Sequence, residues 1–331
     1  MSSRLYSSKP TIAPPWLIKN EEEANRLLFD EREFAQAQMH LEKDNGNFSF
    51  VSAAIGTSSR HTVGGFDVGV TSFQGPRPTM EDEHLLSDFR LRMNGASLEA
   101  QLFGVFDGHG GGEVSQFARN NFQHYLTTGL NRYNRWGLTN RGIINAFTFA
   151  FKRLNEDLKS SAIDADRSGS TSIVILIINN TLWVANIGDS RAILCSSYGT
   201  KQTSVDASTN VPRFQAEVGA SGHGIYPDEY GDLRVEHRLN MTRALGNFSL
   251  GDAIQRDPII TSYSLDELGD DLHLIIACDG IFDVASSSQI GSAVYKNRHL
   301  PADRLASSIV YSSNRARSTD NQTAMVIKLI R

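Results

Sequence analysis

Short runs of apolar residues, separated by turn-forming residues, occupy most of the chain after residue 65. Phe66, Val68 and Val70 alternate with other residues, which is the period of a strand with one buried face. The other runs are rich in β-branched residues and are bounded by Gly, Asn, Asp or Ser, as strands usually are. We predict strands at 66–72, 101–106, 172–178, 182–187, 192–195, 273–278 and 324–330.

Three further segments repeat their apolar residues at helical spacing. They predict helices at 112–127, 143–158 and 301–312. Asn179-Asn180 separates two of the β-branched runs, which predicts a tight hairpin turn. Because hairpin-linked strands dominate and regular strand–helix–strand alternation is absent, the pattern favours an α+β fold with antiparallel sheets flanked by helices.

The first 65 residues follow a different pattern. Residues 1–15 are rich in Ser and Pro, which is typical of an extended leader. Asn20 precedes three glutamates and a run of helically spaced apolar residues, so we predict an N-cap and an amphipathic helix at about 21–42. Gly, Ser, Thr and Asn dominate 45–65, which predicts a linker. We therefore divide the chain into an N-terminal extension, 1–65, and a folded domain, 66–331.

Composition narrows the class of protein. Hydrophobic residues make up 40% of the 331 positions, enough for a core, and this argues against a disordered chain. A net charge of −5 without a strongly basic stretch argues against nucleic-acid binding as the main function. No run is long enough to cross a membrane, and no secretory signal is visible. Cys195 and Cys278 cannot form a disulfide framework, so we expect a cytoplasmic protein, with the nucleus as the alternative.

The residues best suited to chemistry are acids placed at the ends of predicted strands. A strand end holds a carboxylate rigidly, and a neighbouring glycine lets the backbone approach a ligand closely. Several such carboxylates brought together form a hard oxygen site that suits Mg²⁺ or Mn²⁺. The acids in such places are Glu81, Asp82, Asp107, Asp279 and Asp320.

Each of these features also has a simpler interpretation, since Asp-Gly is most often a turn. His109 lies among glycines and is either an exposed loop residue or a general acid near a metal site. Arg77, between two prolines, is either a surface charge or a bidentate clamp for phosphate. For the Gly-Asp-Ser-Arg segment at 188–191 we favour an ordinary hairpin turn.

The order of the motifs is more specific than any one of them. They are QGPRPTMED at 74–82, FGVFDGHGG at 103–111, DRSGST at 166–171, ANIGDSRA at 185–192, TRALG at 242–246, ACDGIFDV at 277–284 and DNQT at 320–323. In this order the chain resembles the metal-dependent serine/threonine protein phosphatases of type 2C. The resemblance runs from about residue 65 to the end, and the first 65 residues lie outside it.

The resemblance implies a β-sandwich of two antiparallel sheets flanked by helices, with a pair of Mn²⁺ or Mg²⁺ ions at one end. It implies that Asp107 bridges the two ions and that the Gly108 carbonyl binds one of them. Asp279 and Asp320 would hold the other ion. Glu81 would ligate directly or through water.

Further roles follow from the same resemblance. Asp82 would support the metal ligands. Asp166 matches a carboxylate of a third, weaker metal site, and Asp283 matches the second acid of the Asp-Gly-x-x-Asp motif. Arg77 would bind the substrate phosphate, and His109 would protonate the leaving oxygen.

The implied activity is hydrolysis of phosphoserine and phosphothreonine in proteins by a metal-activated water, without a covalent intermediate. The partner would be a phosphorylated protein, with no nucleic acid and no membrane span, and we expect a monomer. Cys195 and Cys278 lie in or beside apolar strands, so we interpret them as core residues. Two alternatives stay open: a pseudophosphatase that acts as a phosphoprotein-binding scaffold, and a hydrolase of another protein-linked phosphoester.

The chain departs from the family pattern in two places. Asn247 follows Gly246, where the family usually has Asp, and we expect a modest effect because this position is not a core metal ligand. The region 206–238, which forms a flap beside the active site in relatives, is divergent and leaves substrate preference open. Within it His223 and Tyr226 are either substrate contacts or, as we favour, exposed loop residues.

Overall fold

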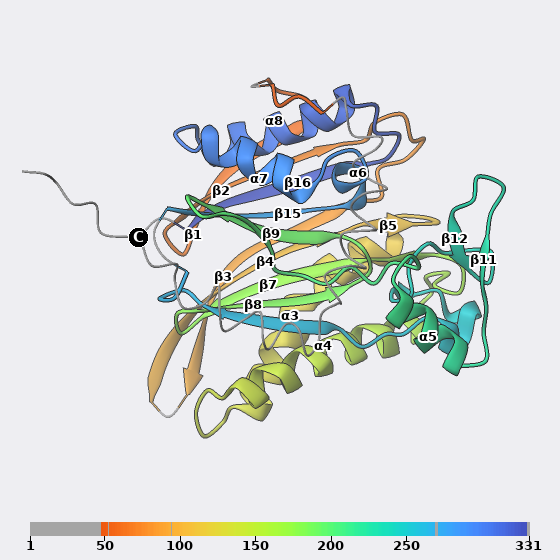
Figure 1. Ribbon diagram of the computed structural model, residues 1–331. Helices are drawn as coiled ribbons and strands as arrows, with labels where there is room; N and C mark the ends of the chain where they lie inside the picture. Colours follow the sequence, from red (N-terminus) through yellow and green to blue (C-terminus); the bar gives the residue numbers. More distant parts are fainter. Residues whose placement is uncertain (1–47, 52, 94, 269–270, 330–331) are drawn as a thin grey trace, which may run out of the picture.

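Two antiparallel sheets stacked face to face form the centre of the molecule, with helices against both outer faces (Figure 1). The computed structural model describes residues 48–51, 53–93, 95–268 and 271–329. The α+β prediction is confirmed. The helix predicted at 21–42 lies outside the described residues.

One sheet has six strands in the order β1-β2-β16-β15-β9-β10, and every neighbouring pair is antiparallel. Its two central strands, β15 and β16, are buried along their whole length. The strands are β1 (Thr57–Val63), β2 (Phe66–Phe73), β9 (Arg191–Ser196), β10 (Gly199–Gln202), β15 (Leu272–Ala277) and β16 (Gln322–Leu329).

The other sheet has five strands in the order β14-β8-β7-β4-β3, again antiparallel. Asn179 and Asn180 join β7 to β8 with φ of 47° and 61°, the left-handed pair that a two-residue hairpin needs, so that prediction is confirmed. The strands are β3 (Glu83–Met93), β4 (Ala96–Phe106), β7 (Ser172–Ile178), β8 (Thr181–Ile187) and β14 (Ile259–Ser264).

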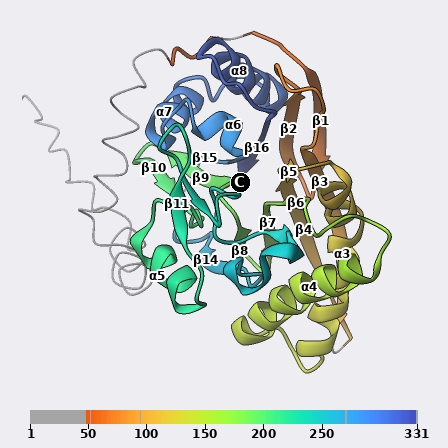
Figure 2. The same cartoon turned by 90° about the vertical axis from the view of Figure 1, so that its right-hand side faces the viewer.

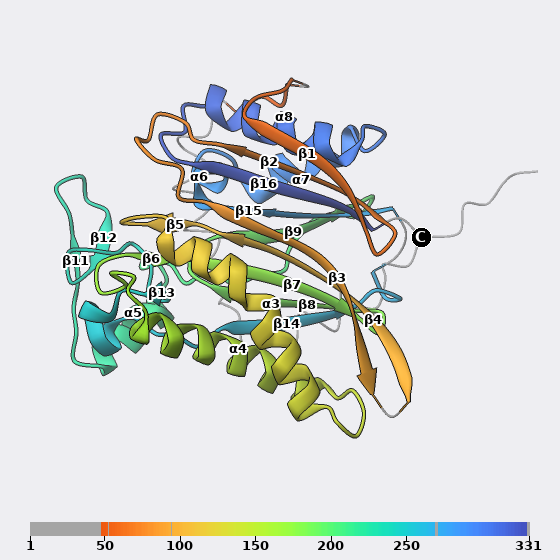
Figure 3. The same cartoon turned by 180° about the vertical axis from the view of Figure 1, so that it is seen from behind.

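In the described part of the chain, four helices of ten or more residues cover the outer faces. α3 (Glu113–Tyr133) and α4 (Asn140–Ser160) pack together over the five-stranded sheet, whereas α7 (Ser287–Lys296) and α8 (Ala302–Arg315) lie over the six-stranded sheet (Figures 2 and 3). α3, α4 and α8 contain or overlap the three predicted helices. Thr139 caps α4 by accepting a hydrogen bond from the Gly142 amide at 3.0 Å.

Two apolar layers hold the sandwich together. One lies between the sheets and under α7 and α8, and includes Phe103, Ile175 and Ile275, all fully buried. The other lies under α3 and α4, where the rings of Phe122 and Phe151 meet edge to face with centroids 5.0 Å apart. Close packing on both faces makes the sheets a stiff support for the loops at their ends.

The shorter elements gather at the right-hand end of the sandwich in Figure 1. β5, β6 and β13 pair into a small sheet, and β11 and β12 form a separate hairpin. These elements are β5 (Gly108–His109), β6 (Gly169–Ser170), β13 (Leu245–Gly246), β11 (Ile225–Pro227), β12 (Leu233–Val235), α5 (Pro212–Ala220), α6 (Asp279–Phe282) and the 3₁₀ segment η1 (Phe248–Ala253).

The linker prediction for 45–65 is wrong over β1. This stretch is polar because β1 is an edge strand whose side chains are mostly exposed, so it has little hydrophobic periodicity to detect. β3 and β14 were also not predicted, because β3 carries charged residues and β14 carries Thr and Ser among its apolar residues. The boundary at residue 65 between extension and domain stays a prediction.

Candidate metal centre

The end of the sandwich where the short elements gather is also where the predicted carboxylates meet. Asp107 directly follows β4, Asp82 directly precedes β3, and Asp279 begins α6 just after β15. Hydrogen bonds fix the backbone of Asp107: its amide donates to Thr171 Oγ1 at 3.1 Å, and its carbonyl accepts from the Thr171 amide at 2.8 Å. Both sheets therefore contribute acids to one cluster.

Burial and mutual repulsion raise the pKa values of these acids. Burial is the largest cause for Asp82, whose pKa rises to about 7, and Asp279 adds to the effect. Burial, followed by the charges of Asp279 and Asp82, holds the pKa of Asp107 well above its usual range. Burial and Asp279 raise the pKa of Asp283 to about 8. Buried acids that repel one another in this way need positive charge close by.

Asp82 provides the clearest sign that a cation belongs here. It is 7% exposed, and neither carboxylate oxygen has a hydrogen bond of ordinary geometry among the described residues. One ligand atom each from Asp82, Asp107 and Cys278 lie within 4.8 Å of one another. Burial and the neighbouring acids raise the pKa of the Cys278 thiol well above its usual range, so it stays protonated. The available donors are carboxylate oxygens, which fit Mg²⁺ or Mn²⁺.

Glu81 and Gly108 are held against each other at the edge of the cluster. Glu81 Oε2 accepts from the Gly111 amide at 3.0 Å, and Glu81 Oε1 accepts from Thr79 Oγ1 at 2.7 Å. A Cβ atom on Gly108 would lie 2.5 Å from the Glu81 carbonyl oxygen and 2.8 Å from Ser115 Oγ. Position 108 therefore accepts only glycine without a local shift.

Arg77 points its guanidinium at the cluster. Its Nη2 lies 2.5 Å from Asp320 Oδ2, and its Nε donates to the Thr319 carbonyl at 3.2 Å. The other oxygen of Asp320 accepts from the Asn321 amide at 2.7 Å. The Arg77 side chain is 53% exposed, so solvent reaches it from the opposite side. An exposed cation beside a group of acids is well placed to receive an anion.

His109 lies on the short strand β5 and contacts Asn247. Its Nε2 lies 2.8 Å from Asn247 Oδ1. Burial lowers the pKa of His109, and the Asn247 hydrogen bond and the charge of Glu81 oppose this effect. Asn247 thus contacts His109, a predicted catalytic residue, and the sequence did not indicate this contact.

Asp166 is placed differently from the other predicted ligands. Its side chain is exposed, and its carbonyl accepts hydrogen bonds from the amide and Oγ of Ser249. No contact among the described residues joins its carboxylate to the buried acids, whereas Asp283 lies close to Asp279. An ion held by Asp166 stays a prediction.

Asp189 belongs to the cluster, and the sequence analysis missed it. Residues 188–191 connect β8 of one sheet to β9 of the other, so the hairpin interpretation is wrong. Burial and the charges of Asp279 and Asp283 raise the pKa of Asp189 well above its usual range, and its Oδ1 has no hydrogen bond among the described residues. Like Asp107 and Asp279, Asp189 lies beside a glycine and close to a strand end. The same sequence pattern could therefore have identified it as a candidate metal ligand.

Residues 66–322 match the family model for Protein phosphatase 2C. The chain belongs to the protein phosphatase 2C family. It is 29% identical to Protein phosphatase 2C homolog 2 of Aspergillus fumigatus, over 79% of this chain and 64% of that protein. It is 32% identical to Probable protein phosphatase 2C 2 of Oryza sativa subsp. japonica, over 76% of this chain and 69% of that one. The chain thus spans slightly less than two thirds of the Aspergillus relative.

The fold is also shared with solved structures. A sex-determining protein of C. elegans superposes with a TM-score of 0.68 at 22% identity, over 80% of this chain and 65% of that one. The predicted β-sandwich of two antiparallel sheets flanked by helices is therefore confirmed. Within the described part of the chain, no helix is both long and apolar enough to span a membrane.

Residues 206–238, the predicted flap, approach the acidic cluster. Burial is the main cause of the raised pKa of Asp283, and the charge of Asp232, just before β12, makes a small addition to it. His223 Nδ1 lies 3.3 Å from Glu236 Oε1, and the ring of Tyr226 stacks on His237 with centroids 4.3 Å apart. Both predicted flap residues thus have partners within the flap.

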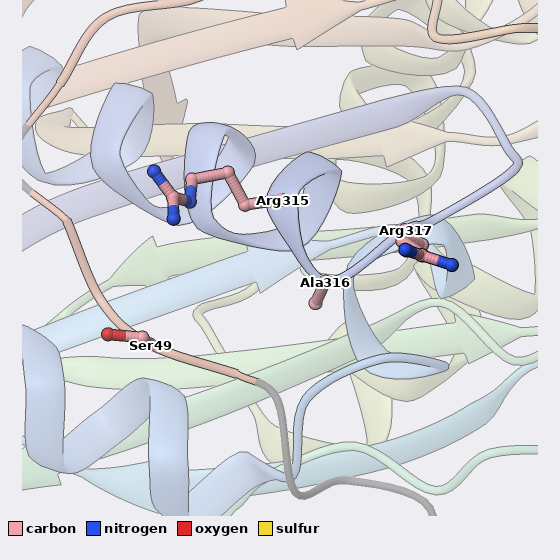
Figure 4. A pocket seen from close by; sticks show the side chains of 4 residues that line it. All are labelled: Ser49, Arg315, Ala316 and Arg317. Carbon is pink, nitrogen blue, oxygen red and sulfur yellow. The ribbon is translucent and has the colours of Figure 1, made fainter.

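Two cavities lie away from the buried acids. One of about 300 Å³ lies within the flap and is lined by Gln215, Gly219, His223, Ile225 and Leu233. The other, of about 290 Å³, lies where α8 ends and faces the segment at Ser49 (Figure 4). Arg315, Ala316 and Arg317 complete its lining. Neither cavity includes a residue of the predicted metal centre.

Proposed function

We propose that this protein hydrolyses phosphoserine and phosphothreonine in protein substrates with the help of divalent metal ions. The observation that supports this most strongly is the convergence of buried carboxylates beside an exposed arginine, with two Asp82 oxygens that accept no hydrogen bond of ordinary geometry from the described residues. A phosphate monoester dianion repels nucleophiles, and its uncatalysed hydrolysis is among the slowest known reactions. Such a substrate requires positive charge around the phosphoryl group, which this site is built to gather.

The chain's own residues divide the work. Asp107, Asp279, Asp320 and the Gly108 carbonyl would hold two Mn²⁺ or Mg²⁺ ions, with Glu81 beside them. When bound, the ions would neutralise phosphoryl oxygens and lower the pKa of a water molecule. A third, weaker ion near Asp166 belongs to the same proposal, as does Asp283 as a further acid of the metal centre.

Arg77 would bind the phosphate. To do so its guanidinium must leave Asp320, where it now forms an ion pair, and offer its donor fork to two phosphoryl oxygens. His109 would protonate the leaving serine or threonine oxygen. A covalent cysteine intermediate does not fit, because Cys195 and Cys278 are buried and burial raises the pKa of both thiols. We also propose a monomer in the cytoplasm or nucleus.

The test is hydrolysis of a phosphothreonine peptide with Mn²⁺, with Mg²⁺ and with EDTA, by the unaltered chain and by Asp279→Asn. We expect activity only with metal, and a loss of at least about 100-fold in Asp279→Asn, as for removal of a charge-stabilising group. Asp252→Asn, on the exposed surface, is the matched control and should keep full activity. Metal-loaded, folded protein that cleaves neither phosphothreonine nor phosphoserine peptides would refute the proposal.

A further inference from the structure

Three short strands align His109 with Asn247. In the sheet β13-β6-β5, His109 pairs with Gly169, and Gly169 pairs with Gly246, the residue before Asn247. The Cβ atom that any other residue would carry at position 169 would strike Asn247 Oδ1 and lie 2.5 Å from His109 Nε2. Glycine in the middle strand therefore leaves the gap across which the two side chains meet.

The backbone of Asn247 is fixed as tightly as its side chain. Asn247 is 1% exposed and has φ of 49°, a left-handed conformation that asparagine tolerates better than most residues. Its amide donates to the Ser168 carbonyl at 3.0 Å. The preceding amide, of Gly246, donates to Asn155 Oδ1 at 3.2 Å. The side chain of Asn247 consequently has little freedom to turn away from His109.

The orientation of the Asn247 amide follows from its second partner. Its Nδ2 donates to the Arg167 carbonyl at 3.2 Å, and a carbonyl oxygen can only accept. The amide oxygen must then face His109, where it can only accept as well. The hydrogen of that bond has to come from His109 Nε2.

We propose that Asn247 is a positioning residue that fixes the orientation of the His109 ring by holding a hydrogen on Nε2, so that any proton the ring exchanges with a substrate must pass through Nδ1. The bond made by one ring nitrogen determines the state of the other. This inference rests on the proposed function only for the step in which the doubly protonated ring would give its Nδ1 proton to the leaving phosphoester oxygen and keep the hydrogen on Nε2. The tautomer itself is a property of the protein without substrate.

The amide does something that a carboxylate cannot. It accepts from His109 and donates to Arg167 at once, whereas both oxygens of an aspartate would be acceptors and one would face the Arg167 carbonyl. The Asn247 side chain thus ties β5 to the loop that carries Arg167. The departure from the usual family residue noted in the sequence acts on the predicted general acid.

The tautomer can be read directly from the ring-nitrogen chemical shifts of protein labelled with ¹⁵N-histidine at pH 8, in EDTA and again with diamagnetic Mg²⁺. His109→Gln identifies the signals. We expect His109 in the unaltered protein to carry its hydrogen on Nε2. Asn247→Gly removes the acceptor without straining the backbone, because glycine adopts positive φ freely. It should lower the ratio of Nε2–H to Nδ1–H form by about fivefold, as for loss of one hydrogen bond of ~1 kcal/mol.

Two further variants separate the acceptor from loop stability. Asn247→Asp retains an acceptor and should keep the Nε2–H form. Asn155→Ala removes support from the same turn without touching His109, and should leave the tautomer unchanged. Phosphopeptide kinetics should show a lower kcat with KM within about twofold for Asn247→Gly, and recovery in Asn247→Asp.

Three outcomes would overturn the inference: a hydrogen on Nδ1 in the unaltered protein, no tautomer change in Asn247→Gly, or an equal change in Asn155→Ala. If Asn247→Gly does not fold, Gly169→Ala serves instead, because its methyl group separates the same two atoms. A protein without phosphatase activity would refute the proposed function and still leave the tautomer measurement valid. The two proposals can therefore fail independently.

Discussion

Asp82→Asn should make the metal-free protein more stable at high pH, although it removes a residue of the metal centre. The pKa of the Asp82 carboxyl is about 7 in the folded protein and near 4 in an unfolded chain. The folded state therefore binds this proton more tightly. The stabilisation of the folded state by this Asp82 proton is complete below about pH 4 and is lost as the pH rises through 7.

The size of the effect follows from the same two values. Each pKa unit corresponds to about 1.4 kcal/mol, so ionising Asp82 in the folded protein costs about 4 kcal/mol above pH 7. An amide at this position avoids the cost. In urea unfolding with EDTA at pH 8, Asp82→Asn should be more stable than the unaltered chain by up to about 4 kcal/mol, and by less than about 1 kcal/mol at pH 4.5.

The exposed residue Asp88, on the neighbouring strand β3, provides the matched control. Asp88→Asn should leave stability within about 0.5 kcal/mol at both pH values, as surface substitutions do. Saturating Mn²⁺ should stabilise the unaltered chain more than Asp82→Asn. An Asp82→Asn protein whose stability advantage in EDTA does not grow between pH 4.5 and 8 would show that Asp82 is not held ionised against repulsion.

Three other predictions concern individual contacts. Arg77→Ala should raise KM for a phosphopeptide by about 10- to 100-fold, as expected for loss of a charge-assisted hydrogen bond. Equal KM values for the variant and the unaltered chain would show that Arg77 does not bind the phosphate. Gly108→Ala should lower the melting temperature and weaken Mn²⁺ binding in calorimetry, because the added methyl meets the Glu81 carbonyl, and an unchanged binding isotherm would contradict this. Asp189→Asn should weaken Mn²⁺ binding about tenfold, as for loss of a residue next to metal ligands, and unaltered affinity would make Asp189 purely structural.

The sequence predicted the parts of the fold where burial is one-sided or complete. The run Ser172–Ile178 and its partner Thr181–Ile187 are buried along most of their length, and their turn residues adopt the required left-handed conformation. Edge strand β1 could not be found this way. It has a neighbouring strand on one side only, so its polar side chains remain in water. Pairing with β2, and not local hydrophobicity, makes it a strand.

The candidate site was predictable where a motif stands at a strand end and not where tertiary contacts decide. Asp107 and Asp279 could be named because each follows an apolar strand. Asp189 was interpreted as part of a turn, since only the crossing from β8 to β9 brings it to the other acids. The contact between Asn247 and His109 depends on the pairing of β5, β6 and β13, which are two residues each and leave no periodicity in the sequence.

The division of the acids between the two sheets has a mechanical consequence. Asp107 extends from β4 of one sheet, and Asp279 follows β15 of the other. An ion shared by these two carboxylates would cross-link segments far apart in the chain, much as a disulfide does. Bound metal should then reduce local opening between the two sheets. Amide hydrogen exchange along β4 and β15 should be slower in the metal-loaded protein than in the metal-free protein.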